Sequence, residues 1–448
     1  MWDERGSDLD QNSHRRGLLH LRKPETSIGP STGLAGWIAH RLLANYWFLA
    51  LCAVLAAPCA IALSLVADRA GATAWLLDRD LAPVQTSDAA QEVVGIVAGI
   101  DAAFITLYFS ISLIVLTIAA GNLGVRLIDR WLGRRLVRVS IGGLSFSLVF
   151  AVLALAAIDS EADLAETPLV TVALTIALLG VNVAMLAVAL HDLGRTMFVD
   201  KAIDALATDA SVSAFEVVGR EAFAGDFAQQ IAAPRHGYVE GVDLEYLGGH
   251  LADHAGAMRI CVAPGQHVLE GEPLALFERE LSSPEEVRKS IPIGPFRSDS
   301  QGSVFQIRLL VEIAARALSP AVNDFYTALA AADALTQVML RHGANWVDEG
   351  QMPVSSAHPG FELPGQDFRG LFDDPLDAFR QAAADYPSVA IRMIANYGRI
   401  VALCDGNSGL VSFLREKARE LCEHAVACAE VERDRHDIEA ALARVSTS

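Results

Sequence analysis

Residues 46–67 read YWFLALCAVLAAPCAIALSLVA, a run without a single charged side chain. The hydrocarbon core of a bilayer is about 30 Å thick, so a helix needs about 20 apolar residues to cross it. Tyr46 and Trp47 open the run, which is typical of the aromatic belt at a membrane interface. The stretch therefore predicts a transmembrane helix.

Three further apolar segments of similar length follow, at about 95–120, 139–158 and 168–190. Hydrophobic residues make up 52% of the chain and its mean hydropathy is +0.33. Nearly all of this excess lies between residues 46 and 190, since the remainder resembles ordinary globular sequence. We predict a four-helix transmembrane domain over 46–190, a basic N-terminal tail over 1–45 and a C-terminal domain over 191–448.

Basic residues mark three of the flanks of these segments. They occur in the tail 1–45, between the second and third segments (Arg126 to Arg138), and just after the fourth (Arg195 and Lys201). The other two loops are acidic, and basic flanks face the cytoplasm. We therefore expect a multi-pass protein of the plasma (inner) membrane with both termini cytoplasmic, anchored by a first helix that is not a signal peptide.

Polar side chains lie within the apolar segments. The candidates for a polar path are Asp101, Tyr108, Ser112, Thr171, Thr175 and Asn182. An intramembrane carboxylate is costly and usually functional, which favours a conduit. The alternative is that the hydroxyl and amide groups only tie helices together, as small residues such as Ser147 do in the third segment.

The C-terminal domain is strongly acidic. From residue 203 to the end there are 20 Lys+Arg and 36 Asp+Glu, a balance of −16. Nucleic-acid binding needs clustered cations, so we expect no nucleic-acid partner, whereas the acidic surface suits a protein partner. The six cysteines form no CxxC pair, and His250 and His254 are an isolated pair, so the sequence predicts neither disulfides, nor a metal site, nor a cofactor.

Residues 191–234 have apolar positions three and four apart and predict two short amphipathic helices. Residues 235–280 then alternate and are broken by Pro264-Gly265 and Gly271-Glu272-Pro273, which predicts strands and turns. This β-rich module resembles half of a barrel-sandwich fold of biotinyl and lipoyl carriers. It contains no lysine, which excludes a covalently bound carrier group.

Residues 303–342 predict two helices joined by a corner at Ser319-Pro320. The candidate residues of this corner are Arg308, Glu312, Arg316, Ser319, Pro320, Asn323 and Asp324. One interpretation is a packed hairpin with a capped turn. The other is an anion site at the helix N-terminus beside Arg316. Residues 345–373 read as a surface loop and 374–446 as helices, which completes a prediction of four transmembrane helices followed by an α+β domain.

Several of these features together resemble a known bacterial family. They are the four apolar helices, the basic loop after the second helix, the Gly-Tyr-Val … Pro-Gly … Gly-x-Pro-Leu segment, and the Ala-x-x-Ala-Leu-Ser-Pro-x-x-Asn-Asp corner at 314–324. The chain resembles, over about residues 35–430, predicted membrane proteins catalogued as a domain of unknown function. Members usually have Gly where this chain has Ala321 and Pro where it has Phe325. The resemblance implies no established activity.

No common catalytic or nucleotide-binding motif occurs in the sequence: it lacks GxxxxGK[ST], GxGxxG, HExxH and GxSxG. We therefore name no catalytic residue and expect a non-enzymatic membrane protein. The first hypothesis is an oligomeric pore or gated conduit with a cytoplasmic regulatory domain. The alternative is a membrane-anchored sensor or scaffold whose acidic domain binds a partner, and an enzyme centred on the corner ranks last.

Overall fold

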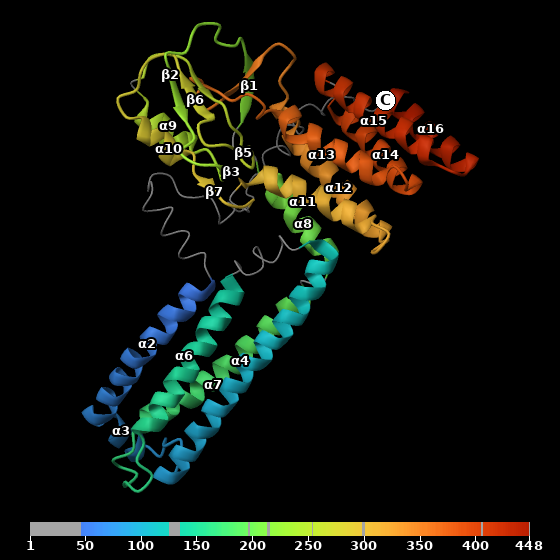
Figure 1. Ribbon diagram of the computed structural model, residues 1–448. Helices are drawn as coiled ribbons and strands as arrows, with labels where there is room; N and C mark the ends of the chain where they lie inside the picture. The colour runs from blue at the N-terminus through green and yellow to red at the C-terminus, as the bar shows by residue number, and fades with distance from the viewer. Residues whose placement is uncertain are drawn as a thin grey trace, which may run out of the picture.

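The computed structural model describes residues 46–124, 135–195, 198–212, 216–252, 254–297, 301–404 and 406–447. Two sequence predictions fall outside these ranges, namely the basic tail 1–45 and most of the basic loop between the second and third segments, residues 125–134. The described chain forms an elongated bundle of helices and a C-terminal domain at one end of it (Figure 1).

Four long apolar helices build the bundle: α2 (Tyr46–Ala67), α4 (Ser87–Leu123), α6 (Arg135–Ala157) and α7 (Leu169–Arg195). Each is long and apolar enough to cross a membrane. With a rise of 1.5 Å per residue, the 22 residues of α2 span about 33 Å, slightly more than a hydrocarbon core. Large apolar side chains such as Leu63 and Leu113 are exposed on the bundle, as expected of a surface that lipid covers.

At the end of the bundle far from the C-terminal domain, α2 continues into a π-helical turn (Asp68–Ala72) and the short helix α3 (Thr73–Asp78). Helix α4 then begins at Ser87, eight residues before the predicted start of the second span at 95. Its N-terminus is capped by Thr86, whose side chain accepts a hydrogen bond from the backbone of Ala89. The cap extends α4 beyond its apolar stretch, and hydropathy alone does not detect such an extension.

The C-terminal domain contains two hydrophobic cores, one among strands and one among helices. The strands, with two short helices, form what we call the β lobe. Its elements are β1 (Val217–Arg220), β2 (Gln229–Ala232), β3 (Gly237–Val239), α9 (Leu244–His250), β4 (Met258–Ile260), β5 (His267–Val268), β6 (Pro273–Phe277), α10 (Pro284–Ser290), β7 (Ile293–Gly294), β8 (Met352–Ser355) and β9 (Phe361–Glu362). One sheet has six strands in the order β1-β8-β9-β4-β6-β2, and the other has three in the order β5-β3-β7.

The remaining elements form what we call the helical lobe. They are α8 (Val199–Ala210), α11 (Ser303–Ala317), α12 (Phe325–His342), the 3-10 turn η3 (Gly343–Asn345), α13 (Phe368–Ala383), α14 (Pro387–Leu403), α15 (Ser408–Cys428) and α16 (Glu432–Thr447). Helix α8 follows α7 directly and packs against α11 and α12, so the lobe adjoins the end of the bundle (Figure 1).

The predicted fold class, four apolar helices followed by a mixed helical and sheet domain, is confirmed. The strands of 235–280 divide between the two sheets, and within the described residues neither sheet closes into a barrel. The barrel-sandwich resemblance is therefore not confirmed, although the region does contain strands and turns.

The prediction of a surface loop over 345–373 was wrong. Residues 352–355 and 361–362 form β8 and β9 inside the six-stranded sheet, and α13 already begins at Phe368. Phe361, Leu363, Phe368 and Phe372 are all buried. Strands of four and two residues are too short to show an alternating pattern, so the Pro and Gly residues around them dominated the prediction.

The prediction of a second helix within 191–234 was also wrong. The first corresponds to α8, but residues 217–220 form β1, which pairs antiparallel with β8 from Val217–Ser355 to Arg220–Met352. The adjacent β-branched residues Val217 and Val218 favour this extended conformation. Their partner strand lies more than 130 residues away, in the stretch that was predicted to be a loop.

A buried lysine stabilises the helical lobe. Lys417 on α15 lies 2.6 Å from Asp373 and 2.9 Å from Asp377, both on α13. Burial alone would lower the pKa of Lys417, but hydrogen bonds to these carboxylates outweigh burial and raise that pKa. We expect Lys417→Met to lower the free energy of unfolding by about 2 kcal/mol, because it removes the lysine partner of Asp373 and leaves Asp377 only the longer contact with Arg380.

A urea titration of the detergent-solubilised chain, followed by circular dichroism, measures this loss. The matched control is Lys289→Met, since Lys289 is exposed and, among the described residues, pairs only with Glu286 on its own helix. Equal midpoints for wild type and Lys417→Met would show that the buried ion pair contributes nothing.

Candidate functional site

Two copies of the tripeptide Pro-Gly-Gln meet at one edge of the six-stranded sheet. Strands β4 and β9 pair in parallel, with Met258 beside Phe361 and Arg259 beside Glu362. Because parallel strands end at the same edge, the segments that follow them, Pro264-Gly265-Gln266 and Pro364-Gly365-Gln366, lie close together. The amide of Gln366 donates a 3.0 Å hydrogen bond to the carbonyl oxygen of Val262 and so links the two segments.

Both turns need their glycine. Gly265 has φ +82° and Gly365 has φ +69°, a region of backbone conformation that other residues rarely adopt. The first turn leads into β5 of the three-stranded sheet, and the second leads into α13 of the helical lobe.

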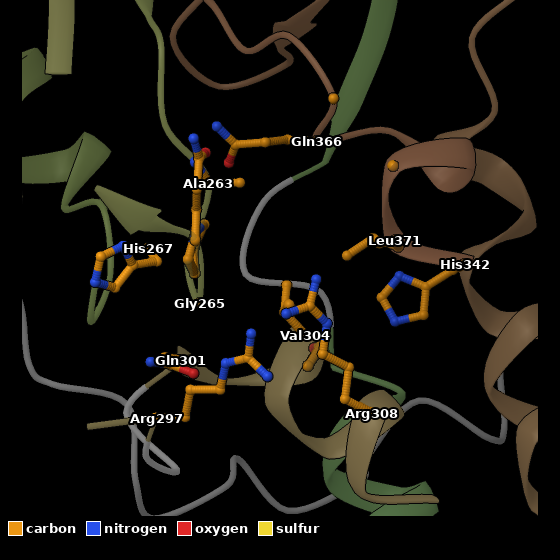
Figure 2. A pocket seen from close by; sticks show the side chains of 15 residues that line it. Ala263, Gly265, His267, Arg297, Gln301, Val304, Arg308, His342, Gln366 and Leu371 are labelled. Carbon is orange, nitrogen blue, oxygen red and sulfur yellow. The ribbon is translucent and has the colours of Figure 1, made fainter. Parts of the chain in front are cut away.

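A cavity of about 330 Å³ lies between these turns and the helical lobe (Figure 2). The β lobe contributes both turns, His267 and Arg297, whereas the helical lobe contributes the first turns of α11 and α13 and the end of α12. Its lining residues are Ala263, Pro264, Gly265, Gln266, His267, Arg297, Gln301, Ser303, Val304, Arg308, His342, Gly365, Gln366, Gly370 and Leu371. The volume is at the lower end of the range for small-molecule sites, which begins at about 300 Å³.

The lining is basic. Its described residues include Arg297, Arg308 and two histidines but no Asp or Glu, and Figure 2 shows both guanidinium groups directed into the cavity. Neither guanidinium forms an ion pair with a carboxylate in the described part of the chain. Burial and the charge of Arg297 lower the pKa of Arg308, and the charge of Asp374 opposes this only in part. An anion placed between the two arginines would relieve both effects.

Three buried polar atoms of the lining have no hydrogen-bond partner in the described structure. They are Nε2 of Gln301, Oε1 of Gln366 and Nδ1 of His342. The three side chains are only 3%, 5% and 1% exposed, respectively. A buried polar group without a partner costs about 1–3 kcal/mol, so these atoms indicate a place where a polar ligand or water completes the hydrogen bonding.

The protonation of His342 is defined by its surroundings. Its Nε2 lies 2.7 Å from the carbonyl oxygen of Ala210, which can only accept, so Nε2 carries the hydrogen and Nδ1 of the neutral ring is an acceptor. The ring also packs edge-on against Phe372. Burial lowers the pKa of His342 from its ordinary 6.5, and this outweighs the opposite effect of the hydrogen bond to Ala210.

This pKa shift predicts a pH dependence of stability. Below pH 6.5 the unfolded chain binds a proton at His342 that the folded chain resists, so the free energy of unfolding should fall as the pH drops from 6.5 toward the lower folded-state pKa. In His342→Gln this part of the fall should be absent. Urea titrations of both proteins at about pH 7.5 and about pH 5.5 measure it. If the free energy of unfolding fell equally in wild type and His342→Gln between these pH values, the assignment of the pH dependence to His342 would be contradicted.

The predicted polar path in the bundle divides into two clusters. In the first, Asp101 on α4 is fully buried and accepts hydrogen bonds from Ser147 of α6 at 2.6 Å and Asn182 of α7 at 2.8 Å. The structure therefore brings together two residues predicted for the polar path, Asp101 and Asn182. It adds Ser147, which was predicted only to pack between helices. Tyr108 and Ser112 are buried on the following turns of α4.

The second cluster centres on Asp68, which the sequence analysis did not single out. Its Oδ1 accepts hydrogen bonds from the side chain of Thr73 and the backbone of Val170, and its Oδ2 accepts from the backbone and side chain of Thr171. Asp68 thus caps the N-terminus of α7 from another helix. Thr175 donates to the carbonyl oxygen of Thr171 on its own helix, and no hydrogen bond among the described residues joins the two clusters.

At the corner between α11 and α12 the polar groups serve the turn itself. Asp324 caps α12 by accepting from the backbone and side chain of Thr327, and the Ser319 hydroxyl donates to the carbonyl oxygen of Arg316. Asn323, three residues after Pro320, has φ +49°. Glu312 and Arg316 approach each other to 3.6 Å. Of the seven corner candidates, Arg308 alone lines the cavity.

The described residues contain no group of three or more His, Cys, Asp or Glu side chains that could hold a metal ion. Nδ1 of His250 lies 3.0 Å from the carbonyl oxygen of Tyr246, and the ring of His254 packs edge-on against Phe277. These two histidines therefore have local packing roles.

The family described as "Predicted membrane protein (DUF2254)" matches residues 44–397, which cover most of the chain. The chain belongs to this family. The resemblance expected from the Ala-Leu-Ser-Pro corner is thereby confirmed.

Curated relatives of this family member are themselves uncharacterised. The chain is 26% identical over 258 residues to the uncharacterized protein MT1328 of Mycobacterium tuberculosis (strain CDC 1551 / Oshkosh), and equally to the uncharacterized protein Mb1321c of Mycobacterium bovis. The match covers 52% of this chain and 49% of each relative, so the chain matches about half the length of these relatives. No solved structure matches the chain.

Most of the cavity residues in this family member were missed by sequence reasoning. Gln301, His342 and Gln366 come from segments far apart in the chain and carry no motif of their own. One signal was present, because Pro-Gly-Gln occurs at 264–266 and again at 364–366. A repeated turn sequence after two short apolar runs can mark two strands that end at the same edge of a sheet.

Proposed function

We propose that this chain is a membrane-anchored sensor that binds a small polar ligand in the cavity between its two lobes and passes the binding state to the membrane helices through α11. The observation that carries the proposal is the position of α11. Its first turns line the cavity with Ser303, Val304 and Arg308. Its later turns contact the end of α4, where a Cβ added at Gly124 would lie only 3.3 Å from Oε1 of Glu312.

Helix geometry supports this coupling. Arg308, Glu312 and Arg316 are four residues apart and share one face of α11, so the side that reaches the ligand is continuous with the side that reaches α4. A helix moves largely as a rigid body, and a shift of its N-terminus on ligand binding therefore displaces the Glu312 contact. Coupling of this kind needs no residue that touches both ligand and membrane.

We place the C-terminal domain in the cytoplasm, and both chain ends with it. The support is the distribution of basic residues, which favours the cytoplasm for the tail 1–45, for the loop after α4 and for the residues that follow α7. A ligand of the cavity is then a cytoplasmic molecule.

The coupling can be tested without knowing the ligand. Val304→Trp fills part of the cavity and should displace the first turn of α11. We expect hydrogen–deuterium exchange of the purified chain to change at 303–310 and also at the end of α4, residues 117–123. The matched control is Val431→Trp, since Val431 is exposed outside the cavity. Altered exchange in α11 with unaltered exchange in α4 would overturn the coupling.

A second candidate function is the oligomeric gated conduit. It is favoured by one observation, the fully buried Asp101 that gathers side chains of three helices. Such a carboxylate can bind a transported cation when a conduit opens. The test is ion flux in proteoliposomes under gradients of protons, sodium, potassium and chloride. Wild type should conduct and Asp101→Asn should not, and behaviour of both like empty vesicles removes the conduit.

A further inference from the structure

The cavity and the domain that holds it have opposite charge. The chain from residue 203 onward has a balance of −16, yet the described residues that line the cavity include two arginines, two histidines and no carboxylate. Several other basic residues of this domain, Lys417 and Arg259 among them, form ion pairs with acids. The cavity therefore differs in charge from the domain around it, and its local positive charge selects an anion from the surrounding solution.

The cationic side of the cavity is also rich in hydrogen-bond donors. Beside Arg297 and Arg308 it holds the buried amide of Gln301, whose Nε2 has no partner in the described structure. Helix α11 begins here as well, after Gly302 at φ +60°, and no side chain caps it. Free N–H groups and the positive end of the helix dipole thus add to the two guanidinium groups. Two arginines and a helix end together suit a group with two negative charges better than a single carboxylate.

The rest of the cavity has the opposite hydrogen-bonding character. The hydrogen bond from Nε2 of Gln366 to the carbonyl oxygen of Val262 fixes the orientation of this amide, so its other atom, Oε1, is an acceptor. Nδ1 of His342 is an acceptor for as long as Nε2 donates to Ala210. Both buried acceptors lack a donor, so a ligand that fills this side must itself present O–H or N–H groups.

We infer that the cavity binds a small phosphomonoester that carries hydroxyl groups. The phosphate lies between Arg297 and Arg308 beside the Gln301 amide and the start of α11. One hydroxyl of the ligand body donates to Oε1 of Gln366, and a second donates to Nδ1 of His342. This inference deepens the proposed function and rests on it, because it names the ligand to which α11 responds.

Isothermal titration calorimetry of the full chain in detergent, in a buffer free of phosphate and sulfate, tests the inference. The probes are glycerol 3-phosphate, inorganic phosphate and glycerol. We expect glycerol 3-phosphate to bind about fivefold more tightly than inorganic phosphate, through the added hydroxyl hydrogen bonds, and glycerol not to bind. Binding of glycerol without binding of either phosphate would overturn the inference.

Variants locate the binding. Arg308→Gln and Arg297→Gln should each weaken glycerol 3-phosphate binding by about tenfold or more, since each removes a charge-assisted hydrogen bond. Arg279→Gln is the matched control, because Arg279 is exposed and outside the lining. Gln301→Glu is a second, nearly isosteric variant that places a carboxylate in the cavity and should abolish glycerol 3-phosphate binding. It tests the site even if an arginine variant fails to fold. Unchanged affinity in Arg297→Gln and Gln301→Glu would overturn the inference.

A phosphomonoester can also be a lipid headgroup, and a second arm of the experiment separates the two sources. The full chain is placed in phosphatidylcholine nanodiscs with or without phosphatidic acid and then titrated with glycerol 3-phosphate. Competition by phosphatidic acid that an equal content of phosphatidylglycerol, a phosphodiester, does not produce assigns the lipid as the source. Absence of competition assigns a soluble ligand, and both results support the phosphomonoester class.

The inference and the proposed function can fail separately. If Val304→Trp alters exchange in α4 while no phosphate binds the wild type, the ligand class is wrong and the coupling through α11 stands. If glycerol 3-phosphate binds and Gln301→Glu abolishes that binding while α4 exchange never changes, the site stands and the sensor proposal falls.

Discussion

Gly370→Ala is expected to lower the free energy of unfolding by about 3 kcal/mol or more and to destroy the cavity. A Cβ at this position would lie 1.8 Å from the carbonyl oxygen of Gly365 and 2.4 Å from its carbonyl carbon. These are backbone atoms of the second Pro-Gly-Gln turn, which cannot rotate away as the tip of a side chain could. The turn, the first turn of α13 or both must therefore shift.

The measurement is a urea titration of the solubilised chain, and calorimetry with glycerol 3-phosphate provides a second readout. Gly249→Ala is the matched control, because Gly249 lies within helix α9 and a Cβ there meets nothing within 4 Å. Alanine at 249 should be neutral or stabilising by up to about 1 kcal/mol, as alanine is the better helix former. Comparable stabilities for Gly370→Ala and Gly249→Ala would mean that the two turns do not pack as closely as described.

Asp68→Ala is expected to have the second largest effect, a loss of about 2–3 kcal/mol. The carboxylate accepts four hydrogen bonds, two from backbone N–H groups at the start of α7 and two from threonine hydroxyls. Its removal leaves the two backbone N–H groups without this acceptor and takes the cap from α7, whereas the hydroxyls of Thr171 and Thr73 keep Ser64 and the carbonyl oxygen of Thr167 as partners. Because Asp68 follows α2 in the chain, the contact between the first and fourth spans weakens as well.

Thermal unfolding in detergent, followed by circular dichroism, measures the change. Asp68→Asn should retain part of the stability, since one of its oxygens is kept as an acceptor. Asp78→Ala is the control, because Asp78 is exposed at the end of α3 and the described structure gives it no hydrogen bond. An Asp68→Ala protein that unfolds at the wild-type temperature would show that α7 does not depend on this cap.

Elements with a strong local pattern could be predicted from the sequence. The four spans follow from apolar length, and the α11–α12 corner follows from Ser319-Pro320 and the cap at Asp324. These signals are local because membrane insertion and helix capping depend on adjacent residues. The short strands β1, β8 and β9 could not be predicted, since each is held by a partner distant in the chain.

The cavity could not be predicted from local sequence patterns for the same reason. Arg308 was singled out as one of a row of charges on a helix, but nothing near it in sequence indicates that Arg297, His342 and Gln366 surround the same space. In the bundle, Asp101 and Asn182 were placed on separate helices without evidence that they meet. Asp68 was overlooked because it follows the end of an apolar run, where an acid is ordinarily a solvated residue.

Neither lobe is formed by one continuous segment of the chain. The chain passes between them after α8, after β7, after η3 and after β9, so that α11 and α12 form an insertion within the six-stranded sheet. During synthesis, the edge of β4 therefore stays unpaired until about 100 more residues have been added and β9 is complete. A chain truncated before residue 361 lacks that strand and leaves apolar residues such as Phe277 and Met258 without part of their cover. Such fragments should aggregate, and neither lobe can be isolated by a single cut in the chain.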